Sequence, residues 1–221
     1  MSRADAATAR RVTADWARRF DGFDVWGPLR LMRRIGPVVQ GITLDRTTTG
    51  DGYFPTAHVH NLARESPVIT LSLGQRLVGS SGMQERVRFS RHCDDFIDAA
   101  ERLALQSDLL LSAPPAVAEI VKKYIYFAVS QQKKGYPPAV DAVEDGILIP
   151  AATGDRALVE DGLRIARELA GVWPKSRLPL DWSGSDAWIS DLEERAAHVN
   201  QLTAVIERQV VFHKLTKVRV V

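Results

Sequence analysis

The pattern of apolar residues in this chain changes at Ser90, and that change restricts the fold more than any other feature. Between residues 29 and 73 the apolar positions are rich in β-branched residues and alternate with polar ones, which is typical of strands. Beyond Ser90 they recur every three or four residues, which is typical of amphipathic helices. We therefore predict an α+β fold, in which a small antiparallel β-meander packs against several α-helices and a long helix lies near the C-terminus.

Three runs make up the predicted meander, and a helix precedes them. The strands are expected at residues 29–44, 53–62 and 67–73, with the sequence TTTGDG forming the turn between the first two. Residues 4–20 carry apolar side chains at four-residue spacing and predict an amphipathic helix.

The second half of the chain is expected to be mainly helical. Helices are predicted to begin at Ser90, Ser112, Asp155 and Ser185, where a side-chain oxygen can cap the first turn. The last residues, VVFHKLTKVRVV, alternate enough to predict an edge strand. The acidic trio of Asp141, Glu144 and Asp145 lacks the ligand pattern of a calcium loop, so we expect it in a solvated loop.

Composition indicates one globular unit. The 221 residues are 45% hydrophobic and 25% charged, which is enough apolar surface to offset the conformational entropy of the chain. We expect a single α+β domain over residues 1–221. The polar, proline-containing stretch QQKKGYPP is the one place for a subdomain boundary, near residues 133–138.

The cysteine content and the lack of long apolar segments suggest the compartment. Cys93 is the one cysteine, so no internal disulfide can form, and a reducing cytoplasm is the expected location. The N-terminal residues lack the apolar stretch of a signal peptide, and no segment approaches the roughly 20 apolar residues of a membrane span. We expect a cytoplasmic protein that does not enter a membrane.

The sequence Thr56-Ala57-His58-Val59-His60 is the most specific candidate for chemistry. In a regular strand, period-two geometry places His58 and His60 on one face, with their Cα atoms roughly 7 Å apart. Imidazole is the commonest protein ligand of zinc and related metals, and Glu65 could supply a third ligand. A divalent transition metal is therefore the expected cofactor if this site is catalytic.

The same stretch resembles the first metal-binding motif of the cupin family, through Gly52, His58, His60 and Glu65. The resemblance implies a β-barrel that holds a metal ion. It covers about a tenth of the chain, however, and the helical sequence after Ser90 disagrees with a barrel. We therefore do not assign the chain to that family.

The two histidines have other interpretations. They could be hydrogen-bonded to neighbours in the sheet such as Thr56, Thr70 or Ser72, which is the commoner role of a histidine in a strand. They could also contact phosphate or nucleic acid together with Arg46 or Arg64. Separately, Arg33 and Arg34 precede a strand that contains Gln40 between glycines, and this arrangement could bind a ligand or a partner strand.

Charge is distributed unevenly, although the formal net charge is only +2. Basic residues gather near both ends of the chain, at Arg10, Arg11, Arg18, Arg19, Arg30, Arg33 and Arg34 and at Arg208, Lys214, Lys217 and Arg219. If the two ends meet, they form a basic patch for nucleic acid or for an acidic partner.

Signatures of common enzymes are absent from the sequence. There is no phosphate-binding glycine loop, no GxGxxG, no GxSxG, no HExxH and no paired CxxC. The leading hypothesis is therefore a non-catalytic interaction protein, an accessory or immunity-type protein of a bacterial system that binds a protein partner. The alternatives are a metal-dependent hydrolase or oxygenase that uses His58 and His60, and a nucleic-acid-binding protein that uses the basic ends.

Overall fold

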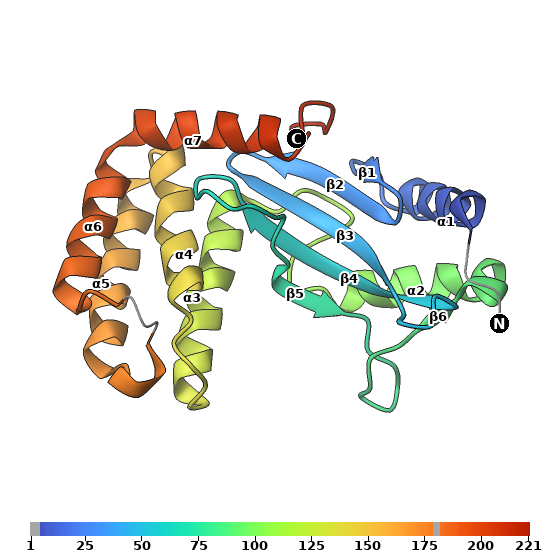
Figure 1. Ribbon diagram of the computed structural model, residues 1–221, viewed down its shortest axis with the longest axis horizontal. Coiled ribbons are helices and arrows are strands. Elements are labelled where there is room, and N and C mark those ends of the chain that lie inside the picture. Colours follow the sequence, from blue (N-terminus) through green and yellow to red (C-terminus); the bar gives the residue numbers. More distant parts are fainter. Residues whose placement is uncertain (1–4, 179–181) are drawn as a thin grey trace.

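The computed structural model describes residues 5–178 and 182–221 and confirms the α+β class (Figure 1). The helices are α1 (Ala6–Arg19), α2 (His92–Gln106), α3 (Val117–Lys133), α4 (Val140–Thr153), α5 (Arg156–Val172), α6 (Ser185–Ala197) and α7 (Val199–Phe212). The strands are β1 (Asp24–Gly27), β2 (Arg30–Ile35), β3 (Val38–Arg46), β4 (Gly52–Asn61), β5 (Ser72–Arg76) and β6 (Val87–Arg88).

The strands form one antiparallel sheet. Their order is β1-β2-β3-β4-β5, and the short β6 pairs with the beginning of β4. Each strand along this path lies beside its neighbour in sequence, as antiparallel strands joined by short connections can do. The predicted meander is confirmed, with more strands than the sequence indicated.

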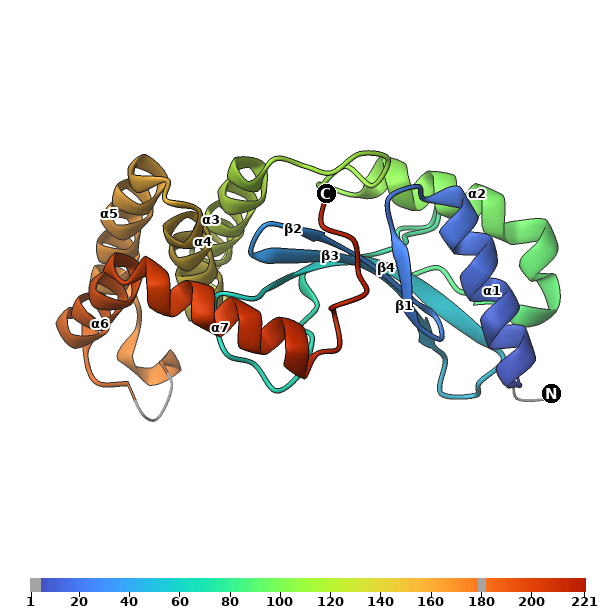
Figure 2. The same cartoon turned by 90° about the horizontal axis from the view of Figure 1, so that it is seen from above.

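The helices are divided between the two ends of the molecule. Helices α1 and α2 pack on the sheet at one end, whereas α3, α4, α5 and α6 stand side by side at the other (Figures 1 and 2). Helix α7 runs from this second group toward the sheet, and the residues after it reach β2, where Arg34 and Val220 form a parallel bridge. Leu215 and Val218 of this segment pack with Met32 and Val39, on the sheet face opposite to α1 and α2.

Two predicted strands differ from the observed ones. The run expected at residues 29–44 is a hairpin of β2 and β3, because the chain turns at Gly36, whose φ of +54° is rarely adopted by a residue with a side chain. The strand expected at residues 67–73 starts later, since residues 67–71 form an irregular loop and β5 begins at Ser72.

The C-terminal region is helical, as predicted, but it contains two helices. His198 has φ and ψ of −98° and 66°, which is outside the helical range, so the chain changes direction between α6 and α7. The predicted edge strand at the C-terminus is wrong. Helix α7 continues to Phe212, and the described residues after it form turns and the one bridge at Val220.

The acidic trio lies in a helix, so the loop prediction is wrong. Helix α4 begins at Val140 and carries Asp141, Glu144 and Asp145 in its first two turns. Carboxylates are favourable near a helix N-terminus, where they interact with the helix dipole. The buried member of the trio, Asp145, faces the protein interior.

The loop between α3 and α4 lies where the subdomain boundary was expected. Both helices nevertheless contribute to one apolar core together with Ile35, Val38 and Val59 of the sheet. The single-domain assignment and the boundary near residues 133–138 stay predictions. None of the described helices combines the length and the apolar character needed to cross a bilayer.

A chain of buried polar groups joins α1, β4 and α2. The Trp16 indole N–H donates to the Tyr53 hydroxyl at 3.1 Å, and that hydroxyl lies 2.7 Å from Nδ1 of His92. The other ring nitrogen of His92 lies 2.9 Å from a carboxylate oxygen of Asp15. Indole is only a donor, so Tyr53 accepts from Trp16 and donates to His92, and His92 donates to Asp15. The donor and the acceptor of each hydrogen bond in this chain are therefore fixed.

Replacing Tyr53 by phenylalanine tests this connection. We expect Tyr53→Phe to lower the free energy of unfolding by about 3 kcal/mol, because the Trp16 donor and the His92 acceptor lose their shared partner inside the protein. Urea unfolding measures the change. Tyr126→Phe is the matched control, since Tyr126 is 71% exposed and its change should stay within about 0.5 kcal/mol. Equal decreases in the free energy of unfolding for the two variants would contradict the buried hydrogen bonds of Tyr53.

Candidate functional site

His58 and His60 lie on one face of β4, as the strand geometry predicted. In the pairing of β3 with β4, His58 is opposite Gly41 and His60 is opposite Val39. Both side chains are buried, with exposed fractions of 3% and 1%. The His58 ring lies directly over Gly41, where a Cβ atom would be 2.3 Å from Nε2 of the ring. The absence of a side chain at Gly41 therefore makes room for the imidazole.

Neighbouring threonines bind both rings. Nε2 of His58 lies 3.0 Å from the Thr43 hydroxyl, and Nδ1 of His60 accepts the backbone N–H of Thr70 at 3.1 Å. The ring of His60 also meets the ring of His213 edge to face, with centroids 5.3 Å apart. Burial lowers the pKa of His58 to about 4 and, together with the charges of His213 and His58, that of His60 to about 3. Both imidazoles are neutral at pH 7.

This arrangement does not fit a resident metal ion. The Glu65 carboxylate is 67% exposed and pairs with Arg208 at 2.8 Å. In neutral His60, Nδ1 is the acceptor for Thr70, so the proton is on Nε2 and that nitrogen has no lone pair for a metal. Within residues 5–178 and 182–221, no three His, Cys, Asp or Glu side chains are grouped to hold an ion. The metal hypothesis stays a prediction without support from the donor set.

Arg33 and Gln40, which were predicted to bind a ligand, are buried and bind each other. Nε of Arg33 donates to Oε1 of Gln40 at 2.9 Å. Its Nη2 donates to the carbonyl oxygens of Leu110 and Ala113, and the guanidinium carbon lies 4.3 Å from the centroid of the Phe23 ring. Burial lowers the pKa of Arg33 to about 10. Arg33 thus binds the segment that connects α2 to α3 to the sheet. Its predicted role in binding a ligand or a partner stays a prediction.

The other two predicted binding residues, Arg34 and Arg64, lie apart from this pair. The backbone of Arg34 binds Arg219, and burial lowers the pKa of its side chain. Arg64 donates to Asp145 at 3.1 Å and to Asp141 at 2.9 Å, so it is neutralised within the protein. The four residues do not form one site, and their predicted binding role is untested.

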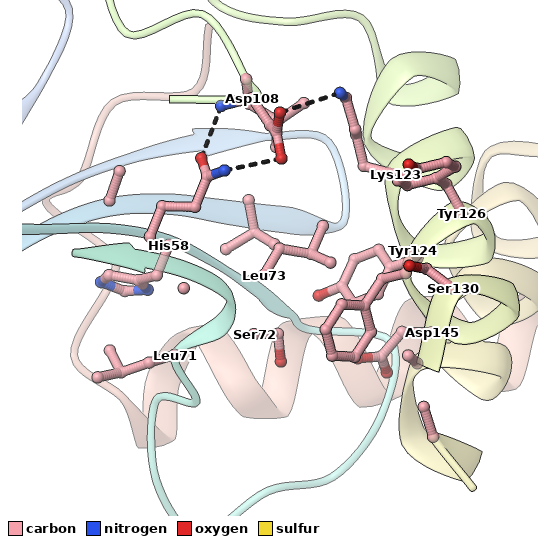
Figure 3. A pocket seen from close by; sticks show the side chains of 18 of the residues that line it. His58, Leu71, Ser72, Leu73, Asp108, Lys123, Tyr124, Tyr126, Ser130 and Asp145 are labelled. Atoms are coloured by element: carbon pink, nitrogen blue, oxygen red, sulfur yellow. Dashed lines mark hydrogen bonds and ion pairs between the residues drawn. The ribbon is translucent and has the colours of Figure 1, made fainter. Parts of the chain in front are cut away.

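A cleft lies between strand β5 and helix α3, and His58 and Asp145 are among its lining residues (Figure 3). Its cavity volume is about 570 Å³, a size suited to a small molecule or a few side chains. Aliphatic residues of the sheet side, among them Leu71 and Leu73, face Tyr124, Tyr126 and other residues of α3 across the cleft. His58 forms part of the wall near β5.

Most charged groups at the cleft are paired, although Lys134, which also lines it, takes part in none of the ion pairs of the described residues. Gln75 donates to the Asp108 carboxylate at 2.7 Å and accepts the backbone N–H of Asp108 at 2.6 Å. The same carboxylate lies 3.4 Å from the Lys123 ammonium (Figure 3). On the inner side, Oδ1 of Asp145 accepts from Asn61 at 3.0 Å and from Arg64. The cleft therefore presents little net charge to an occupant.

Burial shifts the pKa values of the ionisable groups on the inner wall. Burial raises the pKa of Asp145, and Arg64 and Asn61 oppose this shift. Burial raises the pKa of Tyr124 well above its ordinary value, and the nearby Asp145 charge adds to the effect, so the phenol keeps its proton. Tyr124 and His58 are therefore both neutral at pH 7.

The amino-acid sequence does not reveal this cleft. Asp145 was expected in a solvated loop, whereas it is buried on the inner side of the cleft. The amphipathic helix over 117–133 did provide one signal, because Tyr126 lies outside its apolar stripe. An aromatic residue on the polar side of a helix can indicate a contact surface.

The two basic ends meet only in part. Arg19 pairs with Glu101 and Arg208 with Glu65, and Arg18 pairs with Asp15 within α1. Helix α1 lies at the far end of the sheet from α7 (Figures 1 and 2). Arg30 and Lys214, by contrast, line one groove on the sheet.

Comparison of the chain with protein-family models, curated proteins and solved structures finds no match.

Acid should destabilise the fold through the buried histidines. Below pH 6.5 the unfolded chain binds protons at His58 and His60, whereas the folded protein resists protonation until about pH 4 and about pH 3. The free energy of unfolding should therefore fall as the pH decreases from about 6.5 to about 4, by about 2 kcal/mol per pH unit for the two rings together. Urea titrations at several pH values measure this slope.

Two variants identify the source of the slope. His58→Gln with His60→Gln should flatten the pH dependence, while His198→Gln, at an exposed position, should leave it unchanged. NMR titration of the ring protons in the unaltered protein gives an independent measurement. Rings of His58 and His60 that titrate near pH 6.5 would disprove the assignment.

Proposed function

We propose that the chain is a non-catalytic interaction protein that binds a segment of a protein partner in the cleft between β5 and α3. The observation that supports this proposal best is the exposed aromatic rim of a preformed cleft. Tyr126 is 71% exposed and the adjacent Phe127 is 38% exposed, and both line the cavity together with Leu71, which is 43% exposed. Aromatic residues at the edge of a concave site are characteristic of protein-binding surfaces.

The paired charges in the cleft also support binding over catalysis. Lys123 is held by Asp108, and Asp145 is held by Arg64 and Asn61. A general acid or base needs a pKa close to the working pH, and the shifts of His58 and Tyr124 are away from neutrality. Burial raises the pKa of Asp145, but Arg64 and Asn61 oppose this shift. We place the interaction in the bacterial cytoplasm, in the role of an accessory or immunity-type protein, on the basis of the single cysteine and the basic, Arg-rich sequence.

Site-specific crosslinking tests the proposal. A photoreactive phenylalanine analogue in place of Tyr126 should form a covalent adduct with one defined polypeptide in cells. The same analogue at Ile97, a 51% exposed residue of α2, should not form it. The polypeptide, produced in pure form, should bind the unaltered protein and lose at least about tenfold in affinity to Tyr126→Ser with Phe127→Ser, since removal of rim aromatics typically costs more than 1 kcal/mol each.

The matched control is Ile97→Ser, which should bind the polypeptide with unchanged affinity. Circular dichroism and urea unfolding must show that the double variant is folded. A purified partner that binds the folded double variant as tightly as the unaltered protein would refute the cleft as the binding site.

A further inference from the structure

A second hollow lies on the face of the sheet that α1 and α2 do not cover. Its floor is built from paired residues of neighbouring strands, because Arg30 of β2 is opposite Thr43 of β3 and both face the same side. Its walls come from the loop 67–71 and from the turn that follows α7. The cavity volume is about 480 Å³.

The walls of this groove are apolar and open to solvent. Val68 is 61% exposed and Phe212 is 60% exposed, and Met32 closes the bottom with an exposed fraction of 1%. The Trp26 ring adds a flat surface, whose indole N–H is already bound to the carbonyl of His213 at 2.9 Å. Large apolar groups that converge on a concave surface indicate a binding site.

Two cations line the same groove without an acidic partner. Arg30 lies over the Trp26 ring, with its guanidinium carbon 5.5 Å from the ring centroid, and Lys214 follows α7. In the described chain, neither side chain takes part in a salt bridge or a side-chain hydrogen bond. Asp45 also lines the groove, where its carboxylate lies 3.4 Å from Arg76. Two cations against one carboxylate leave the groove with net positive charge.

We propose that this groove binds a small amphipathic carboxylate, with the apolar part against Met32, Val68 and Phe212 and the carboxylate between Arg30 and Lys214. Guanidinium and ammonium groups bind carboxylates through charge-assisted hydrogen bonds, and a partly apolar setting strengthens them. Nucleic acid fits less well, because two cations could neutralise few of the phosphates that a strand carries. The groove shares Leu71 with the cleft between β5 and α3, but Arg30, Lys214 and Phe212 do not line the cleft.

Binding of decanoate to the full chain, measured by calorimetry and by NMR chemical-shift changes, tests the proposal. We expect saturable binding with a dissociation constant below about 1 mM, with shifts centred on Met32, Val68 and Phe212. Decanol has the same apolar chain without the charge and should bind at least about tenfold more weakly, because it cannot pair with the two cations.

Variants at the two cations complete the test. Arg30→Gln with Lys214→Gln should weaken decanoate binding at least about tenfold and leave decanol unaffected, and higher salt should weaken binding to the unaltered protein. Arg10→Gln with Lys122→Gln, two exposed cations outside the groove, is the matched control and should bind decanoate normally.

Three results would overturn the proposal. The first is no saturable decanoate binding, and the second is equal affinity of the Arg30→Gln, Lys214→Gln variant and the unaltered protein. The third is a single-stranded oligonucleotide that displaces decanoate and binds more tightly, which would assign the groove to nucleic acid. Because the rim residues Tyr126 and Phe127 do not line this groove, none of these results bears on the partner-binding cleft.

Discussion

Strand β4 carries the polar contacts on which the arrangement of both helical groups depends. At its beginning, Tyr53 links Trp16 of α1 to His92 of α2. At its end, Asn61 donates to Asp145 of α4. A buried hydrogen bond contributes modestly when it is made, but each unpaired buried group costs more, so these contacts select one arrangement of helices over others. The central strand thus sets the positions of two otherwise separate groups of helices.

The connection between these groups is fixed by a buried cation. Arg33 has no carboxylate partner among the residues that bind it, and its charge is balanced by the carbonyl groups of Leu110 and Ala113 and by the face of Phe23. Carbonyl dipoles and an aromatic face stabilise a guanidinium without fully replacing water, in agreement with its lowered pKa. Because residues 108–109 lie in this connection and also line the cleft, Arg33 indirectly determines the shape of the cleft wall.

Local periodicity was sufficient to predict much of the fold. The helix over 4–20 and the strand over 53–62 were found because their apolar residues follow one period throughout. The features that were missed depend on contacts between distant residues. No local signal shows that Asp145 is buried, since that requires Arg64 and Asn61 from another element. The shared face of His58 and His60 followed from strand geometry, and Thr70 was expected as a neighbour, but the contact of His58 with Thr43 was not.

The contrast between the two hollows follows from where their charges find partners. In the cleft between β5 and α3, Lys123 and Asp145 have partners within the protein, so an occupant gains little from charge and must be recognised mainly by shape and apolar contact. In the groove on the sheet, Arg30 and Lys214 outnumber the lining carboxylate Asp45, which is paired with Arg76. The groove is therefore positive where the cleft is close to neutral, and this difference separates their ligands by charge.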